Sequence, residues 1–252
     1  MPTANAIMLS ISLALEIWLL VLLVRRDVRR HFPVFFSYGL ALGPVTLARL
    51  FTTTDYQTYF LVFWWSDAML LLLGLAALHE VFRWVYRSFY EFWWFRLGYY
   101  GAITAVLLIA IRNAVANPPV QAHPVVSLVL DVGIGINLLQ AGIATLYYAI
   151  MRPLSIEFRR YPYGVVLGFL ISSAGPLLGY LAISVFGTKV QGFARYASPV
   201  SYFLGLAIWL SAFIVPEIEE KEWIPPMSAE RMLHEVRGYL RAMGFKGKGN
   251  EH

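Results

Sequence analysis

Seven long apolar stretches dominate the sequence and leave few options for its fold. A helix that crosses the hydrocarbon core of a bilayer needs about 20 mostly apolar residues. Seven stretches meet this requirement, at roughly 6–24, 33–53, 58–82, 94–112, 124–150, 163–186 and 198–216. Hydrophobic residues make up 59% of the 252-residue chain, and its mean hydropathy is +0.62, which is unusual for a soluble domain of this length. The sequence therefore predicts an all-α integral membrane protein, a bundle of seven transmembrane helices.

The distribution of arginine predicts how the helices are threaded through the membrane. The first stretch ends in the cluster RRDVRRHF and not in a small-residue cleavage site, so we expect it to remain as the first helix. Short loops rich in arginine and lysine stay cytoplasmic. The arginines of three alternate loops are Arg25, Arg26, Arg29, Arg30, Arg83, Arg87, Arg96, Arg152, Arg159 and Arg160. The opposite side has Arg112, Lys189 and Arg195, which predicts an outside N-terminus and a cytoplasmic C-terminus.

The formal net charge of +5 reflects the excess of arginine in one set of loops. Arginines at this level contact anionic lipid headgroups, so we expect the lipid bilayer as a partner and no binding to nucleic acid. We expect a multi-pass protein of a prokaryotic plasma (inner) membrane.

Two parts of unequal length are expected. Residues 1–216 form the seven-helix transmembrane domain, and residues 217–252 form a cytoplasmic tail. In the tail, apolar residues recur at helical spacing after Ser228, a suitable N-cap. These features predict a short amphipathic helix over about 228–243, which lies on the inner leaflet or binds a cytoplasmic partner.

The second and sixth stretches share features that suggest an internal duplication. Both follow paired arginines and an early proline, and both contain a Gly-Pro pair inside the membrane, Gly43-Pro44 and Gly175-Pro176. A parallel 3+1+3 repeat would match the first three helices to the last three. Each proline removes a backbone hydrogen bond and frees a carbonyl, so we expect kinks at these breaks, with the freed group facing protein or a wet cavity. Paired interrupted helices are typical of transporter binding sites.

Four charged residues are expected at one depth in the outer half of the membrane. These are Arg49, Asp67, Arg112 and Asp131. An isolated charge at this depth costs at least about 2.5–3.5 kcal/mol on insertion scales. Pairing inside the bundle removes most of that cost, and we expect Asp67 to face an arginine, with Arg49 as the first candidate, in an outward-opening vestibule.

Polar residues on two other helices complete the candidate site. Glu16 shares a helix face with Asn5 and Ser12, so that face is expected to point inward. In the fifth stretch, small and polar residues occupy two opposite faces, which predicts protein contacts on both sides. One face has Asp131, Gly135 and Gly142, and the other has Gly133, Asn137 and Gln140. The predicted ligand-binding residues are Glu16, Arg49, Asp67, Arg112, Asp131, Asn137 and Gln140, with Ser172 and Ser173 as further candidates. The alternative is a static network that only fixes helix packing.

The sequence gives little support for catalysis or for a cofactor. His79-Glu80 does not begin a zinc-binding HExxH motif, because Arg83 takes the place of the second histidine. His31 and His79 lie on the same side, but we interpret them as interfacial histidines that reach toward water and not as haem ligands. No lysine lies within a span and the chain has no cysteine, so we expect neither a retinal Schiff base nor thiolate chemistry. We expect no enzyme activity, no metal and no cofactor.

Two function classes fit these features. In the first, the charged site binds a small polar or ionic solute and the proline breaks allow the helices to rock, so that the protein is a transporter. In the second, the same site is a receptor for a ligand, and the tail passes the signal to a cytoplasmic partner. The first is favoured because no output domain is evident in the sequence.

Overall fold

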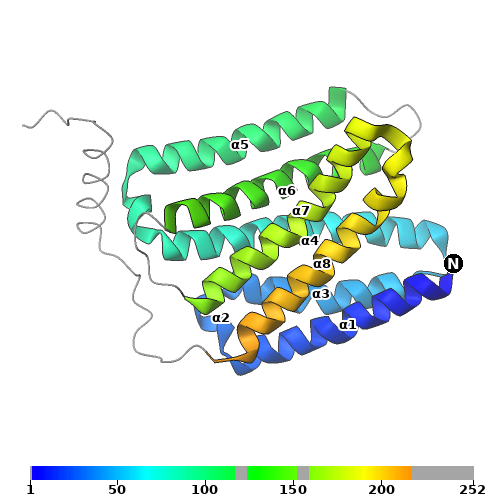
Figure 1. Ribbon diagram of the computed structural model, residues 1–252, viewed down its shortest axis with the longest axis horizontal. Coiled ribbons are helices and arrows are strands. Elements are labelled where there is room, and N and C mark those ends of the chain that lie inside the picture. Colours follow the sequence, from blue (N-terminus) through cyan, green and yellow to red (C-terminus); the bar gives the residue numbers. More distant parts are fainter. Residues whose placement is uncertain (1, 117–123, 152–158, 217–252) are drawn as a thin grey trace, which may run out of the picture.

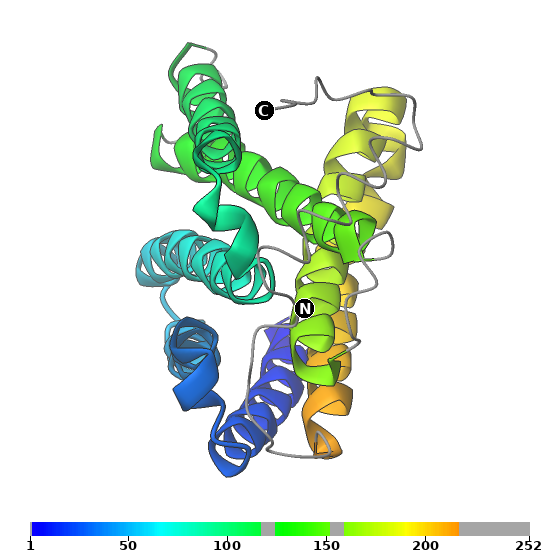
Figure 2. The same ribbon diagram turned by 90° about the vertical axis from the view of Figure 1, so that its left-hand side faces the viewer.

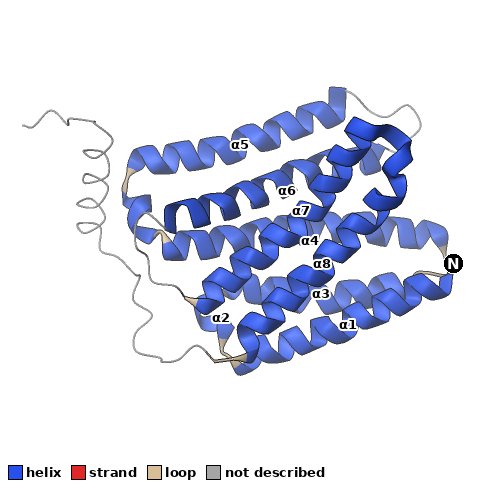
Figure 3. Cartoon of the chain, viewed as in Figure 1, coloured by secondary structure: helices blue, strands red, loops and turns tan. Residues whose placement is uncertain are grey.

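The computed structural model describes residues 2–116, 124–151 and 159–216 as helices with short connections and without a strand among them (Figure 3). The elements are α1 (Pro2–Arg25), α2 (Val28–His31), α3 (Pro33–Phe51), α4 (Tyr56–Val85), η1 (Arg87–Glu91), α5 (Trp93–Ala116), α6 (Pro124–Met151), α7 (Arg160–Phe186), η2 (Gly187–Val190) and α8 (Gln191–Ile214). Seven of these helices are long and apolar enough to cross a membrane, and each matches one predicted stretch. The predicted tail helix at about 228–243 lies outside the described residues.

The largest difference from the predicted boundaries concerns the last helix. It begins at Gln191 and not near 198, because the 3-10 turn η2 leads from α7 directly into it. Pro199 therefore lies inside α8 and not at its start. The short elements α2 and η1 were not predicted, because they contain no long apolar run.

Six of the long helices form a closed ring, and α5 lies outside it. The order around the ring is α1, α3, α4, α6, α7 and α8, which returns to α1. Helix α5 packs its backbone only against α6 and η1 among the described elements. Figures 1 and 2 show α7 and α8 crossing the other helices obliquely and α5 at the edge of the bundle. Helix α6 thus has protein on both sides, as predicted, with α5 on one side and α4 and α7 on the other.

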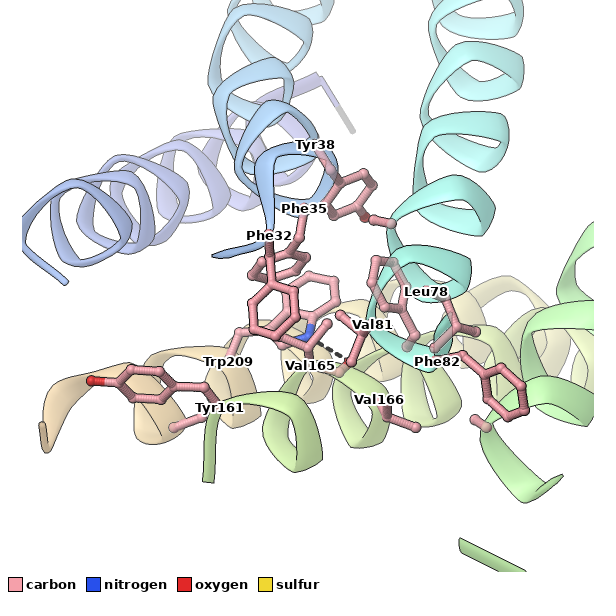
Figure 4. Close-up of a cluster of buried hydrophobic side chains, with 14 of the residues drawn as sticks. Phe32, Phe35, Tyr38, Leu78, Val81, Phe82, Tyr161, Val165, Val166 and Trp209 are labelled. Carbon is pink, nitrogen blue, oxygen red and sulfur yellow. Dashed lines mark hydrogen bonds between the residues drawn. The ribbon is translucent and has the colours of Figure 1, made fainter. Parts of the chain in front are cut away.

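One end of the ring is closed by a dense aromatic core. We call this the arginine-rich end; it holds the last turns of α1, α4 and α8, the first turns of α3 and α7, and Arg26, Arg83 and Arg160. Figure 4 shows side chains from α3, α4, α7 and α8 meeting there. Phe35 makes edge-to-face contacts with Phe169 and Trp209, with ring centroids 6.1 and 5.8 Å apart.

A row of small residues lets α7 and α8 approach closely. Gly164, Gly168, Ser172 and Gly175 recur at three- and four-residue intervals and share one face of α7. A Cβ atom added at Gly168 would lie 2.0 Å from the indole nitrogen of Trp209, and one at Gly175 would lie 2.4 Å from a carbonyl oxygen of α8. We call this row the small-residue seam. It is the arrangement expected for helices that associate within lipid.

Glu80 of α4 caps the first turn of the neighbouring helix α3. Its carboxylate accepts hydrogen bonds from the backbone N–H groups of Val34 and Phe35, each at 3.0 Å. The residue before the helix, Phe32, has no side chain that can cap it. A carboxylate at this position pairs with the exposed donors and the positive end of the helix dipole. Glu80 is therefore a structural tie between α4 and α3.

Two arginines hold the last turn of α8. Arg26 donates to the carbonyl oxygens of Phe213 (3.1 Å) and Ile214 (2.6 Å), and Arg160 donates to that of Ser211 (2.9 Å). The last carbonyls of a helix have no partner within it, and cations are favoured there. These contacts tie the beginning and the end of the membrane domain together.

Candidate functional site

Glu16 is a carboxylate buried between α1 and α8. Only 2% of its surface is exposed. Its Oε1 atom accepts two hydrogen bonds, from the Ser12 hydroxyl at 2.7 Å and from the Tyr202 hydroxyl at 2.6 Å. Its Oε2 atom is also buried and has no hydrogen-bond partner among the described residues. The predicted inward face of the first helix is confirmed for Ser12 and Glu16, whereas the Asn5 side chain lies outside the described residues.

Two tyrosines define the surroundings of this carboxylate. Tyr202 comes from the middle of α8, and Tyr38 of α3 lies within electrostatic range of Glu16 and also of Asp67. Tyr38 is itself 7% exposed and belongs to the aromatic core. Glu16 is therefore surrounded by hydroxyl groups and rings, and no ion pair joins it to any described cation.

Arg49 and Asp67 form the ion pair that the sequence predicts. The guanidinium Nη2 lies 3.5 Å from the carboxylate Oδ1, and Arg49 also donates to the Ser66 hydroxyl at 2.9 Å. The guanidinium lies 4.6 Å from the centre of the Phe63 ring. The arginine side chain is 15% exposed and that of the aspartate 39%. The pair is thus anchored on the arginine side and accessible on the carboxylate side.

The other two charges of the predicted cluster are not part of this pair. Arg112 is exposed on α5 and Asp131 is partly buried on α6. Neither forms an ion pair with another of the described side chains. Arg112 lies on α5, outside the ring, and Asp131 lies on α6, so a common depth does not bring them to Asp67. Their predicted role in binding stays a prediction.

The amide side chains of α6 are buried, and each has a hydrogen-bond partner. Asn137 donates to the carbonyl oxygen of Gly133 one turn earlier, at 2.8 Å. Gln140 donates across to the carbonyl oxygen of Leu71 on α4, at 3.4 Å, and packs beside Gly74. The opposite face of α6 contacts α5, where a Cβ added at Gly135 would lie 2.8 Å from the Cβ of Ala110. Protein contacts on both faces of α6 are therefore confirmed at Gln140 and at Gly135, whereas a Cβ at Gly142 would meet no atom within 4 Å.

Pro176 and Pro44 have different surroundings, although the sequence suggests a related pair. Pro176 removes the hydrogen bond to the Ser172 carbonyl, and the Ser201 hydroxyl of α8 takes that carbonyl instead, at 3.2 Å. The expectation of a freed group facing protein is confirmed there. Pro44 is exposed, and so is Leu40, whose carbonyl it frees. Both α3 and α7 continue through their proline as one helix.

The glycines before these prolines also differ. Gly175 packs directly against α8, whereas a Cβ at Gly43 would meet its nearest neighbour, Leu13, at 3.9 Å. The hydroxyl groups of Ser172 and Ser173 both donate back to the Phe169 carbonyl, at 3.1 and 2.7 Å. These serines are engaged with their own helix. The 3+1+3 repeat stays a prediction.

His79 does not reach toward water, as the sequence suggests, but faces α5. Its ring stacks on Tyr99 with centroids 5.4 Å apart, and its Nδ1 lies 3.0 Å from the Tyr99 hydroxyl oxygen. Tyr90 and Tyr100 lie against the same ring. No three His, Asp or Glu side chains in the described ranges are close enough to hold a metal ion.

An apolar groove lies between α5 and α6. It has a volume of about 500 Å³, and Gly98 and Gly142, whose surroundings are open, are among its lining residues together with Trp94 and Leu139. The groove contains none of the predicted site residues.

Tyr202 is the site residue that sequence analysis missed. It interrupts the apolar run of α8 with a hydroxyl group, which is a weak signal because tyrosine is common in membrane helices. No family model matches the chain, and no curated protein or solved structure is significantly similar to it. No residue role can therefore be transferred from a relative.

Proposed function

We propose that this protein binds a small polar or ionic solute inside its helix bundle and carries it across a prokaryotic plasma membrane. The observation that carries the proposal is the burial of polar side chains inside a ring of membrane-spanning helices. These residues are Ser12, Glu16, Thr46, Asn137, Gln140, Ser173 and Ser201. Ionisable and polar groups at this depth are costly and are typical of solute pathways.

The unequal packing of the two ends supports access from one side. Aromatic residues close the arginine-rich end, including Phe32, Phe35 and Trp209, each fully buried. Toward the opposite end, the Arg49–Asp67 pair is reachable from outside the protein. A solute that enters there would meet the accessible Asp67 carboxylate first and the buried Glu16 further in.

The α7–α8 pair is the unit we expect to move. The small-residue seam and the bond from Ser201 to the Ser172 carbonyl join these two helices closely. Both helices cross the others obliquely (Figure 1), so a small rotation of the pair would change its distance from α1. Rigid-body rocking of such a unit is a common basis of alternating access.

Purified full-length protein in proteoliposomes tests the proposal. Uptake is measured for labelled sodium, potassium, ammonium, phosphate and amino acids, one at a time, with empty vesicles as the baseline. We expect uptake of one class, its loss in Asp67→Asn, and retention in Asp55→Asn, which changes a fully accessible carboxylate at the start of the same helix.

Removal of residues 228–252 distinguishes the transporter from a sensor. Uptake that survives this deletion supports transport by the bundle itself. A chain that takes up none of the solutes, but loses a copurifying cytoplasmic protein on tail deletion, would contradict transport and support signalling.

A further inference from the structure

We propose that Glu16 is a proton-binding site, which holds a proton on Oε2 while α1 and α8 are packed together and releases it when they separate. The inference rests on the proposed transport function and names the coupling ion of that function.

Both hydrogen-bond donors approach the same oxygen of Glu16. Ser12 and Tyr202 donate to Oε1, at 2.7 and 2.6 Å, while Oε2 is buried without a hydrogen-bond partner in the part of the chain that the structure describes. An ionised carboxylate spreads its charge over both oxygens and requires donors at both when it is removed from water. A carboxylic acid needs two acceptor bonds only at its carbonyl oxygen, and Oε1 has them. The arrangement fits the protonated acid with its hydroxyl at Oε2.

The energetic comparison favours the same state. A buried hydroxyl group that lacks a partner loses one hydrogen bond, whereas an unpaired buried charge loses its solvation as a whole. No described arginine or lysine lies within ion-pair distance of Glu16 to compensate such a charge. Protonation therefore neutralises the Glu16 carboxylate in the absence of a paired cation.

The same geometry disfavours a metal cation as the occupant. A cation that enters a protein without its water shell needs several oxygen atoms arranged around it. Ser12 and Tyr202 direct their hydrogens, and not free lone pairs, toward Glu16. Oε2 has no hydrogen-bond partner among the described residues. A single proton is the only cation that this oxygen can bind without further ligands.

The titratable groups around Glu16 offer a route for the proton. Tyr202 faces it from α8 and Tyr38 from α3, and Tyr38 also lies within electrostatic range of Asp67, which pairs with Arg49. When water reaches the site, the Oε2–H bond breaks, its electron pair stays on Oε2, and the proton passes to water as hydronium. Separation of α8 removes the Tyr202 hydrogen bond and admits that water. Proton release is thereby linked to the movement of the α7–α8 pair.

Infrared spectroscopy of the full-length protein in lipid tests the proton site without any solute. At neutral pH we expect a carbonyl-stretch band of a buried protonated carboxylic acid, which is lost in Glu16→Gln. In Tyr202→Phe the band should persist at higher frequency, because Oε1 loses one of its two hydrogen bonds. A purely structural Glu16 would not produce this shift. The matched control Glu80→Gln changes a carboxylate with three backbone hydrogen bonds and should leave the band in place.

The outcomes separate the two proposals. Spectra of wild type and Glu16→Gln that are identical in this region would overturn the proton site, whether or not solute uptake is found. A folded Tyr202→Phe protein whose carbonyl-stretch band does not shift from the wild-type frequency would also overturn it. A band that behaves as expected, in a protein that takes up no solute, would confirm proton binding at Glu16 and contradict transport. Solute uptake that is accompanied by proton movement, with the proton movement lost in Glu16→Gln, would support both.

Discussion

Replacement of Gly168 by alanine tests whether the small-residue seam holds the bundle together. The added Cβ would lie 2.0 Å from Nε1, 2.5 Å from Cδ1 and 2.6 Å from Cε2 of Trp209. That indole is fully buried and packs against Phe35, Tyr38 and Phe169, so it has no free space into which to move. The helices must separate or the ring must leave its position. Either change also breaks the 3.2 Å hydrogen bond from the indole to the Val165 carbonyl.

The expected loss of stability can be worked out from these contacts. Overpacking of a filled core costs about 1–3 kcal/mol, and the lost hydrogen bond about 0.5–1.5 kcal/mol. Alanine is better than glycine inside a helix by about 1 kcal/mol, which opposes the change. The net free energy of unfolding should fall by about 2 kcal/mol, or roughly 4–8 °C in Tm for a chain of this size.

Thermal unfolding in detergent, followed by tryptophan fluorescence and near-ultraviolet circular dichroism, measures this change. The matched control is Gly142→Ala on α6, where the new Cβ meets no atom within 4 Å. The control should keep the wild-type Tm or raise it slightly, because only the helix preference acts. Equal Tm values for the two variants would refute the seam as a close contact.

Three further predictions concern the charged groups. Asp67→Asn should lower Tm more than the double change with Arg49→Gln does, with a coupling energy of about 0.5–1 kcal/mol in a double-mutant cycle, because a single change leaves a partly buried charge unpaired. Glu80→Ala should lower the free energy of unfolding by about 1–2 kcal/mol, because the first turn of α3 loses its cap. The Thr58 hydroxyl, and then the Gln57 N–H, hold the pKa of Asp55 below its usual value, so its contribution to stability is present above about pH 4 and is lost as the pH falls through the folded pKa. Tm measured between pH 6 and about pH 3 should therefore fall less in Asp55→Asn than in wild type.

Each of these predictions has a control in the same chain. Arg112→Gln should show no coupling to Asp67→Asn, and additive effects of Arg49→Gln would contradict the ion pair. Glu91, exposed in η1, serves as the control for Glu80, and equal effects of the two alanine variants would argue against capping. For Asp55, parallel Tm curves of variant and wild type would contradict the pKa shift.

Features that depend on one helix could be predicted from the sequence, whereas features that depend on helix neighbours could not. Run length and arginine position are local, so the seven spans follow from them. The Arg49–Asp67 pair could also be predicted from the sequence, because α3 and α4 are consecutive and a short turn fixes their register. The hydrogen bond from Tyr202 to Glu16 joins residues that are 186 positions apart in the sequence, and no local pattern indicates that α1 and α8 are neighbours.

Depth along a helix does not give position around the ring. Arg112, Asp131 and Asp67 were expected at a common depth, but among the described residues neither Arg112 nor Asp131 forms an ion pair with Asp67. His79 was expected to reach toward water because its place along α4 was known and its facing helix was not. The small-residue seam, by contrast, can be recognised in the sequence, because Gly164, Gly168 and Ser172 recur every four residues.

The contacts of Arg26 with the last carbonyls of α8 have a consequence for the order of events during synthesis. Arg26 leaves the ribosome early, and its acceptors at Phe213 and Ile214 emerge almost at the end of the membrane domain. Until then the ring is open between α1 and α7, and Glu16 lacks the hydrogen bond from Tyr202. A nascent chain therefore completes its polar interior only when the last helix has arrived. A chain that ends before Tyr202 would therefore leave Glu16 with Ser12 as its one hydrogen-bond donor among the described residues.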